Sequence, residues 1–200
     1  MGDTLSKTQP LQIDLSDSPV WHRWLQPLWA ANKFLPALFD ASQIASDMAA
    51  YDAADASGYR AELLTVLRRH LTAAINTIEQ DFLATHDGAV YVGQHARCID
   101  GVLRLLRDEA CKIIPQSDAI AVIAVGGYGR GEMAPFSDID VMFLMPAKTS
   151  KKHEAAIEFM LYLLWDLGLK IGHSTRSVSE AINAGRDDQT VMTSFLEMRL

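Results

Sequence analysis

The stretch that most restricts the possible folds of this chain runs from residue 119 to residue 145 and reads AIAVIAVGGYGRGEMAPFSDIDVMFLM. Its apolar start lies between Pro115 and Gly126 and contains β-branched residues, which is typical of a short buried strand. Its end, DIDVMFLM, has the same character and stops at Pro146. The sequence therefore predicts two strands of a small sheet, joined by a glycine-rich turn.

The residues before this stretch carry helical patterns. Between residues 59 and 84 large apolar side chains recur every three or four positions, namely Leu64, Leu67, Leu71, Ile75, Ile78 and Phe82. After the break THDGAVYVG, a second helix is expected from about residue 94 to residue 114. Residues 1–58 are expected to hold a polar leader and short, proline-interrupted helices rich in aromatic residues.

The residues after Pro146 predict a helix over 151–167 and a third strand in LKIGHSTRS. Ser177 and Glu180 form a capping box for a further helix, which Gly185 could end. A last helix is expected from about residue 188 to the end of the chain.

Together these patterns predict an α+β fold, in which a helical N-terminal half packs on a small mixed sheet. We divide the chain into residues 1–58, a helical subdomain over 59–115, and a sheet-containing core over 116–200. The chain stops within the apolar segment SFLEMRL without a capping residue, so we expect this core to be truncated at its C-terminal end.

Composition excludes several classes of protein. A net charge of −7 over 200 residues argues against a general nucleic-acid binder, because such domains are usually basic. Cys98 and Cys111 lack a neighbouring Cys or His pattern, so we interpret them as idle thiols. No apolar run approaches the ~20 residues of a membrane span, and the N-terminus lacks a signal-peptide pattern. We expect a cytoplasmic protein that binds neither nucleic acid nor membrane.

The glycines of GGYGRGE do not fit the common phosphate-binding fingerprints. Gly127 and Gly129 could begin a dinucleotide-binding motif, but Glu132 stands in the place of its last glycine, and no P-loop lysine follows. Gly126 and Gly127, followed by a short helical piece over 128–133, would still present unpaired N–H groups to a phosphate. The alternative is a tight turn that only needs positive φ.

Two aspartates begin the second strand. Asp138 and Asp140 are two residues apart, so their side chains share one face and lie roughly 6–7 Å apart. Two carboxylates without an adjacent cation repel each other, and a divalent metal such as Mg²⁺ removes that repulsion. The alternative is a solvated strand end, at which the two aspartates are exposed to water and bind no metal.

The glycine turn and the aspartates occur together in a known signature. GGYGRGEMAPFSDIDVMFL resembles the G-[GS]…D-x-D signature of the nucleotidyltransferase superfamily, which has a DNA polymerase β-like fold. More narrowly, GGYGRGE, SDID, LWDLGLKIGHSTRS and LEMRL are similar, in order and spacing, to the N-terminal catalytic domain of bifunctional PII uridylyltransferase/uridylyl-removing enzymes. The resemblance covers about residues 60–200. It implies transfer of UMP from UTP to a tyrosine of the PII signal protein, release of pyrophosphate, and Mg²⁺ as cofactor.

On the matching positions, the resemblance implies that Gly126 and Gly127 bind the triphosphate through their backbone amides. It also implies that Asp138 and Asp140 hold the metal and carry the catalysis, mainly by positioning and charge neutralisation.

Three further residues are candidates for contacts with the nucleotide. They are Arg130, Ser137 and Arg176. Arg130 could instead pin the glycine turn, and Arg176 could instead be a solvated strand residue.

The chain also departs from the superfamily pattern. The third carboxylate that the superfamily often adds on a later strand has no counterpart in LKIGHSTRS, and Asp166 lies at the end of the preceding helix. The general base is therefore unassigned. We interpret His173 as a hydrogen-bonded core residue and the HD pair in THDGAVYVG as loop residues, not as part of a hydrolase site.

Two other functions stay open. The signature is shared with enzymes that transfer AMP to another protein or to a small molecule. The missing acid and the abrupt C-terminal end are compatible with a fragment that binds a nucleotide or PII without turnover.

Overall fold

The structure is a computed structural model that describes residues 39–51, 56–115, 117 and 119–200. Most of the segment over 1–58, with its expected leader and broken helices, lies outside the described residues. The elements are α3 (Ala41–Met48), α4 (Ala56–Thr85), α5 (Gly88–Ile113), β1 (Ala121–Ala124), α6 (Gly126–Gly129), β2 (Ile139–Met145), α7 (Lys151–Asp166), β3 (Ile171–Ser177), α8 (Val178–Asp187) and α9 (Gln189–Leu196).

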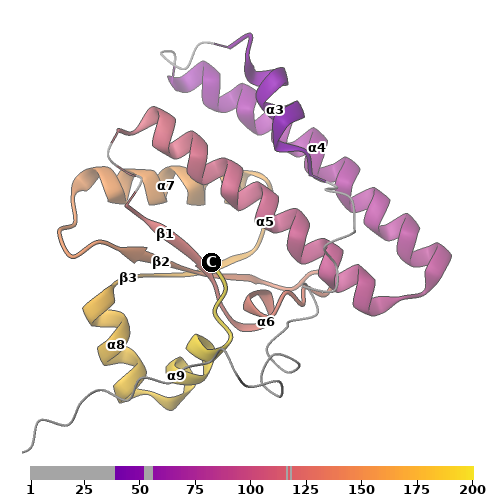
Figure 1. Ribbon diagram of the computed structural model, residues 1–200. Coiled ribbons are helices and arrows are strands. Elements are labelled where there is room, and N and C mark those ends of the chain that lie inside the picture. The colour runs from indigo at the N-terminus through magenta and orange to yellow at the C-terminus, as the bar shows by residue number, and fades with distance from the viewer. Residues whose placement is uncertain (1–38, 52–55, 116, 118) are drawn as a thin grey trace, which may run out of the picture.

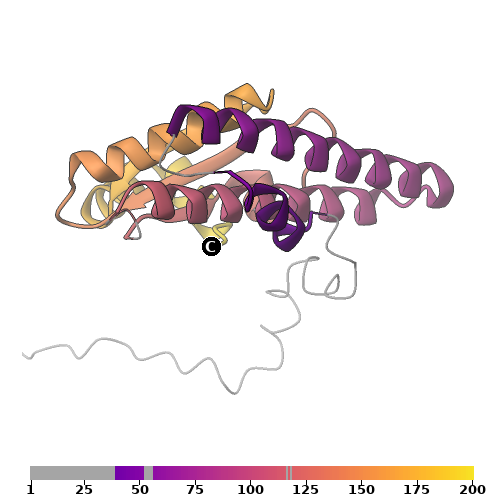
Figure 2. The same ribbon diagram turned by 90° about the horizontal axis from the view of Figure 1, so that it is seen from above.

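The three strands form one mixed sheet in the order β1-β2-β3. β1 pairs with β2 in antiparallel orientation, and β2 pairs with β3 in parallel orientation. The parallel pair needs a crossover, which α7 provides. Figure 1 shows α5 and α7 above the sheet and α8 and α9 below it, and Figure 2 shows α4, α5 and α7 side by side.

One hydrophobic core joins the helices to the sheet. Leu67 of α4, Val102 of α5, Phe143 of β2 and Leu164 of α7 all have 0% exposure and belong to one buried cluster. The predicted α+β class, with a helical N-terminal half on a small mixed sheet, is therefore confirmed. The subdomain boundaries at residues 58 and 115 stay a prediction.

Several predicted helix bounds are wrong, each for a local reason. α5 begins at Gly88 and not near residue 94, because the Asp87 carboxylate accepts hydrogen bonds from the Ala89 and Val90 amides at 3.0 Å each. Asp87 thus lies in the loop between α4 and α5, as predicted, and caps the N-terminus of α5. α8 continues past Gly185, where a Cβ would lie 3.2 Å from the Phe195 ring.

The last helix also ends earlier than predicted. α9 stops at Leu196, and Arg199 leaves the helical path to form a bridge with Ala124 at the edge of β1. The Ala124 amide donates to the Arg199 carbonyl at 2.8 Å, and the Arg199 amide donates to the Ala124 carbonyl at 3.0 Å. The apolar spacing of SFLEMRL continued a helical pattern, but these two strand-type hydrogen bonds replace the helical ones.

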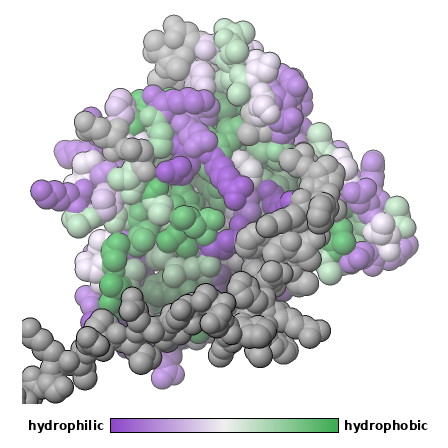
Figure 3. Space-filling view, in the orientation of Figure 1, coloured by the Kyte–Doolittle hydropathy of each residue, from purple (hydrophilic) through white to green (hydrophobic). Residues whose placement is uncertain are grey.

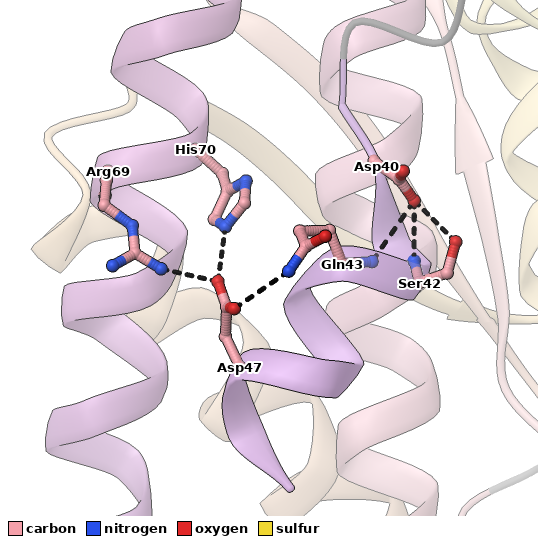
Figure 4. A network of polar contacts seen from close by, with 6 residues as sticks. All are labelled: Asp40, Ser42, Gln43, Asp47, Arg69 and His70. Carbon is pink, nitrogen blue, oxygen red and sulfur yellow. Dashed lines mark hydrogen bonds and ion pairs between the residues drawn. The ribbon is translucent and has the colours of Figure 1, made fainter.

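Helix α3 is attached to α4 by a small polar network, which Figure 4 shows. The Asp47 carboxylate lies 2.5 Å from Arg69 Nη2 and 2.8 Å from His70 Nε2, and it also accepts from the Gln43 side chain. The hydrogen bonds from His70 and Gln43 and the Arg69 charge hold the pKa of Asp47 below its usual value. The charged form of Asp47 therefore stabilises the docked position of α3.

Hydrophobic residues remain exposed on the C-terminal helices. Figure 3 shows hydrophobic surface below α5, whereas hydrophilic residues follow α5 itself. Val178 and Ile182 of α8 and Leu196 of α9 are at least half exposed. Among the described residues, no helix has the length and apolar content that a membrane crossing requires.

Both cysteines are free thiols, as predicted. Cys98 is buried, and burial raises the pKa of its thiol to about 12. Such a thiol stays protonated and unreactive at neutral pH.

Candidate functional site

The glycine turn follows directly from the end of β1. The helical turn α6 covers Gly126–Gly129, earlier than the predicted 128–133, because Gly126 adopts a φ of +60° and turns the chain out of the strand. The Gly129 amide donates to the Val125 carbonyl at 2.9 Å, and the Arg130 amide donates to the Gly126 carbonyl at 3.1 Å. The N–H groups of Gly126 and Gly127 precede this first bond, as the first N–H groups of a helical turn always do.

The turn lies against the predicted carboxylates. The Val125 amide donates to the backbone carbonyl of Asp140 at 3.0 Å, which fixes the start of the turn beside β2. A Cβ on Gly126 would lie 3.5 Å from Asp140 Oδ2. The structure thus brings the glycine turn and Asp140 together, as the sequence analysis expected.

A third strand completes the surroundings of Asp140. Gly172 of β3 is its direct partner in the parallel pairing, and a Cβ on Gly172 would collide with Asp140 Oδ1. The Asp140 carboxylate therefore occupies the space between Gly126 and Gly172. Sequence reasoning missed Gly172. The only signal was its place in LKIGHSTRS, which by itself does not say which residue lies opposite.

The two carboxylates influence each other. Asp138 lies just before β2, and both aspartates are exposed. Partial burial, and then the charge of Asp138, raises the pKa of Asp140. Within the described part of the chain, no lysine, arginine or histidine forms an ion pair with either aspartate. The same residues contain no group of three or more His, Cys, Asp or Glu side chains that could hold a metal.

Ser137 lies in the turn that leads into Asp138. Its amide donates to the Ala134 carbonyl at 3.2 Å, and its side chain is exposed. The preceding residue, Phe136, has a φ of +65° and is 91% exposed. A bulky residue in the left-handed region is strained, and this ring gains no burial in return.

The structure places the two candidate arginines differently. Arg130 follows α6, and its guanidinium pairs with Glu132 at 3.0 Å and with Glu197 at 2.8 Å, which fits the loop-pinning role. Arg176 pairs with Leu144 and thus shares a sheet face with Asp140, but it lies four residues along β3 from Gly172. That separation is about 13 Å, so the structure does not bring Arg176 beside Asp140.

The other polar residues considered for the site point elsewhere. Asp166 accepts a hydrogen bond from Arg60 at 2.7 Å at the end of α7. His173 faces away from Asp140 and lies against Trp165, with 6.1 Å between ring centroids. It is exposed, so the predicted core histidine is wrong. β3 is an edge strand, and α7 covers it only in part.

Comparison with known proteins agrees with the geometry. Residues 103–187 match the family model of the nucleotidyltransferase domain. The chain is also similar to three proteins named bifunctional uridylyltransferase/uridylyl-removing enzyme. The one from Rhodospirillum rubrum is 42% identical over 147 residues, which is 70% of this chain and 16% of the relative.

The protein from Ruegeria pomeroyi is 42% identical over 158 residues, covering 76% of this chain and 17% of the relative. The protein from Azospirillum brasilense is 39% identical over 171 residues, covering 82% and 18%. The chain therefore spans less than a fifth of the length of these relatives.

Proposed function

Because residues 103–187 belong to the nucleotidyltransferase domain family, we propose that this chain is a cytoplasmic enzyme that transfers UMP from UTP to a tyrosine of the PII signal protein. The names of the relatives supply the nucleotide, since all three are called uridylyltransferases. The resemblance of the sequence motifs supplies the acceptor. The observation that carries the proposal is the uncompensated pair Asp138 and Asp140, lying against the glycine turn at Gly126.

The glycine turn would bind the triphosphate of UTP. Gly126 and Gly127 have no side chain that would keep phosphate oxygens away from the backbone, and their N–H groups precede the first helical bond of α6. Ser137, exposed and adjacent to Asp138, would add a hydroxyl donor.

Asp138 and Asp140 fit a magnesium site. They supply hard carboxylate oxygens and form no ion pair with a cationic side chain in the described chain, and a nucleotide phosphate would complete the ligand set. Bound Mg²⁺ would neutralise charge on the phosphates and on the leaving pyrophosphate. The part played by the chain itself is to hold the two carboxylates in place, which the packing of Asp140 between Gly126 and Gly172 does.

The transfer is a single displacement at phosphorus. The tyrosine oxygen of PII forms a bond to the α-phosphorus of UTP, and the bond from that phosphorus to the bridging oxygen breaks. The electron pair of the broken bond leaves with pyrophosphate, and the hydroxyl proton passes to water. Positioning of the two reactants supplies most of the acceleration in such reactions.

The test uses nucleotides labelled on the α-phosphate, so that only nucleotidyl transfer labels the acceptor. The chain is incubated with PII, Mg²⁺ and labelled UTP or ATP, beside the variants Asp138→Asn and Asp140→Asn. Asp108→Asn is the matched control, because its side chain is 66% exposed on α5, away from the aspartate pair. Label from UTP that both site variants lose and the control keeps supports the proposal.

Other results would favour the alternatives. Label from ATP alone would replace uridylyl transfer with adenylyl transfer. Binding of MgUTP without labelling of PII would favour a nucleotide-binding protein without turnover. One structural feature also favours this alternative: the residue opposite Asp140 on β3 is Gly172 and not a third carboxylate.

A further inference from the structure

Two sequence motifs that lie some seventy residues apart are in direct contact. The segment Leu196–Leu200 packs against α6, the helical part of the glycine turn. A Cβ on Gly129 would collide with the Glu197 carbonyl oxygen, so the two backbones touch. The backbone bridge between Arg199 and Ala124 anchors this segment to the last residue of β1, just before the turn.

The Arg199 side chain holds the end of α6. Its guanidinium donates to the Tyr128 carbonyl at 3.1 Å and to the Gly129 carbonyl at 3.4 Å. The Tyr128 carbonyl also accepts from the Gly131 amide at 3.0 Å, so Arg199 adds a second donor there and a donor to the next carbonyl, that of Gly129. The Arg199 side chain is only 14% exposed.

Asp100 of α5 joins Arg199 to Tyr128. Asp100 Oδ2 lies 2.5 Å from Arg199 Nη1, and Asp100 Oδ1 accepts a hydrogen bond from the Tyr128 hydroxyl at 2.7 Å. The Tyr128 ring is buried, with 3% exposure, and the Arg199 guanidinium lies 5.2 Å from its centre. Burial, and then the Asp100 charge, raises the pKa of Tyr128, so its hydroxyl stays a donor.

We propose that Asp100, Tyr128 and Arg199 are positioning residues that fix the orientation of the glycine turn for the nucleotide triphosphate. The inference rests on the proposed function. A glycine-rich turn loses more backbone entropy on ordering than other segments do, and α6 is a single turn. Contacts that order the turn before the nucleotide arrives lower the cost of binding.

The chain offers a matched control for Tyr128. Tyr59 of α4 is also buried, with 7% exposure, and its hydroxyl donates to Glu109 at 2.6 Å. Tyr59→Phe and Tyr128→Phe each remove one buried hydrogen bond from a tyrosine to a carboxylate. Only the second touches the glycine turn. Arg199→Lys is a further variant that keeps the positive charge but loses the forked geometry.

Three measurements are made on the full chain: hydrogen exchange of the amides over residues 126–130, the affinity for MgUTP by calorimetry, and the KM values for UTP and for PII. Tyr128→Phe and Arg199→Lys should speed exchange at the turn and weaken MgUTP about tenfold, with the KM for PII unchanged. Tyr59→Phe should lower stability without either effect at the turn.

The outcomes separate this inference from the proposed function. If the unaltered chain binds MgUTP and Tyr128→Phe behaves like Tyr59→Phe in exchange and in affinity, the positioning role is wrong and the proposed function stands. If the unaltered chain binds no MgUTP, both fall together.

Discussion

Replacing Gly172 by alanine should abolish nucleotidyl transfer while leaving the fold intact. Gly172 has no positive φ, so the β3 backbone accepts an alanine without strain. The added Cβ, however, would collide with Asp140 Oδ1 and force that carboxylate out of its place. The whole effect of the substitution therefore acts through the proposed metal ligand.

The expected magnitudes differ sharply between stability and activity. Alanine in place of glycine in a strand stabilises by roughly 0.5–1 kcal/mol, and an off-rotamer Asp140 costs about 0.5–1.5 kcal/mol, so the two nearly cancel. A shift of a reacting group by ~1 Å can cost about 100-fold in rate. We expect a change in unfolding free energy within ~1 kcal/mol and at least a 100-fold loss of transfer.

Two other glycines supply the controls. Gly168, just after α7, has a φ of +82° and open space around it, so Gly168→Ala should destabilise by about 1 kcal/mol yet keep the site. Gly88, the first residue of α5, has open space and no positive φ, so Gly88→Ala should stabilise by up to about 1 kcal/mol and leave transfer unchanged. Thermal unfolding and label transfer are measured for all three variants. Full activity in Gly172→Ala, or an equal loss in Gly168→Ala, would refute the reasoning.

Three more predictions concern charge. Asp140→Asn should stabilise the metal-free chain, because two carboxylates roughly 6–7 Å apart repel by about 0.6–2.5 kcal/mol, with the low end expected for exposed groups. This gain in stability should shrink as the pH falls through the raised pKa of Asp140, because the Asp140 carboxyl of the unaltered chain is then protonated and no longer repels Asp138. Calorimetric unfolding of both chains at several pH values measures the difference. MgUTP at 100 times its Kd should stabilise the unaltered chain by about 2.7 kcal/mol, and the shift should vanish in Asp138→Asn; an equal shift in the variant would contradict a metal role. The pKa of Asp47 is lowered from 3.8, so the attachment of α3 to α4 should persist above pH 3.8 and weaken as the pH falls below that value. Hydrogen exchange of the amides over Ala41–Met48 measures this attachment. Asp47→Asn should show the weakened attachment already at neutral pH.

Local sequence rules predicted the elements that depend on local interactions. The strand over DIDVMFLM stands within one residue of β2, and the capping box of Ser177 and Glu180 begins α8, with the Glu180 carboxylate accepting from the Ser177 amide at 2.7 Å. The alternation of side chains along a strand also separated the exposed Asp140 from the buried Ile139.

The rest depended on contacts between distant residues. Only the register between β2 and β3 puts Gly172 opposite Asp140, and that register depends on how both strands pack together, which neither strand's sequence reveals alone. Arg199 likewise looked like the end of a helix, because spacing cannot reveal that its backbone would pair with Ala124. Gly185 was expected to end a helix, but it lies within α8, where the absence of a side chain leaves room for the Phe195 ring.

Two features that cost stability lie where the proposed chemistry takes place. Phe136 holds a φ of +65° while its ring stays 91% exposed, and a residue without β-carbon would relieve about 1–2 kcal/mol there. Two residues later begins the pair of carboxylates in which partial burial, and then repulsion by Asp138, raises the pKa of Asp140. Two other costs lie outside the site: His86, between α4 and α5, has a φ of +57°, and the buried Gln94 Oε1 has no hydrogen-bond partner among the described residues. Within the described part of the chain, strain and like charge lie two residues apart only at the proposed site, and this supports the proposed binding of a metal and nucleotide, because a bound ligand would offset the repulsion between the two carboxylates.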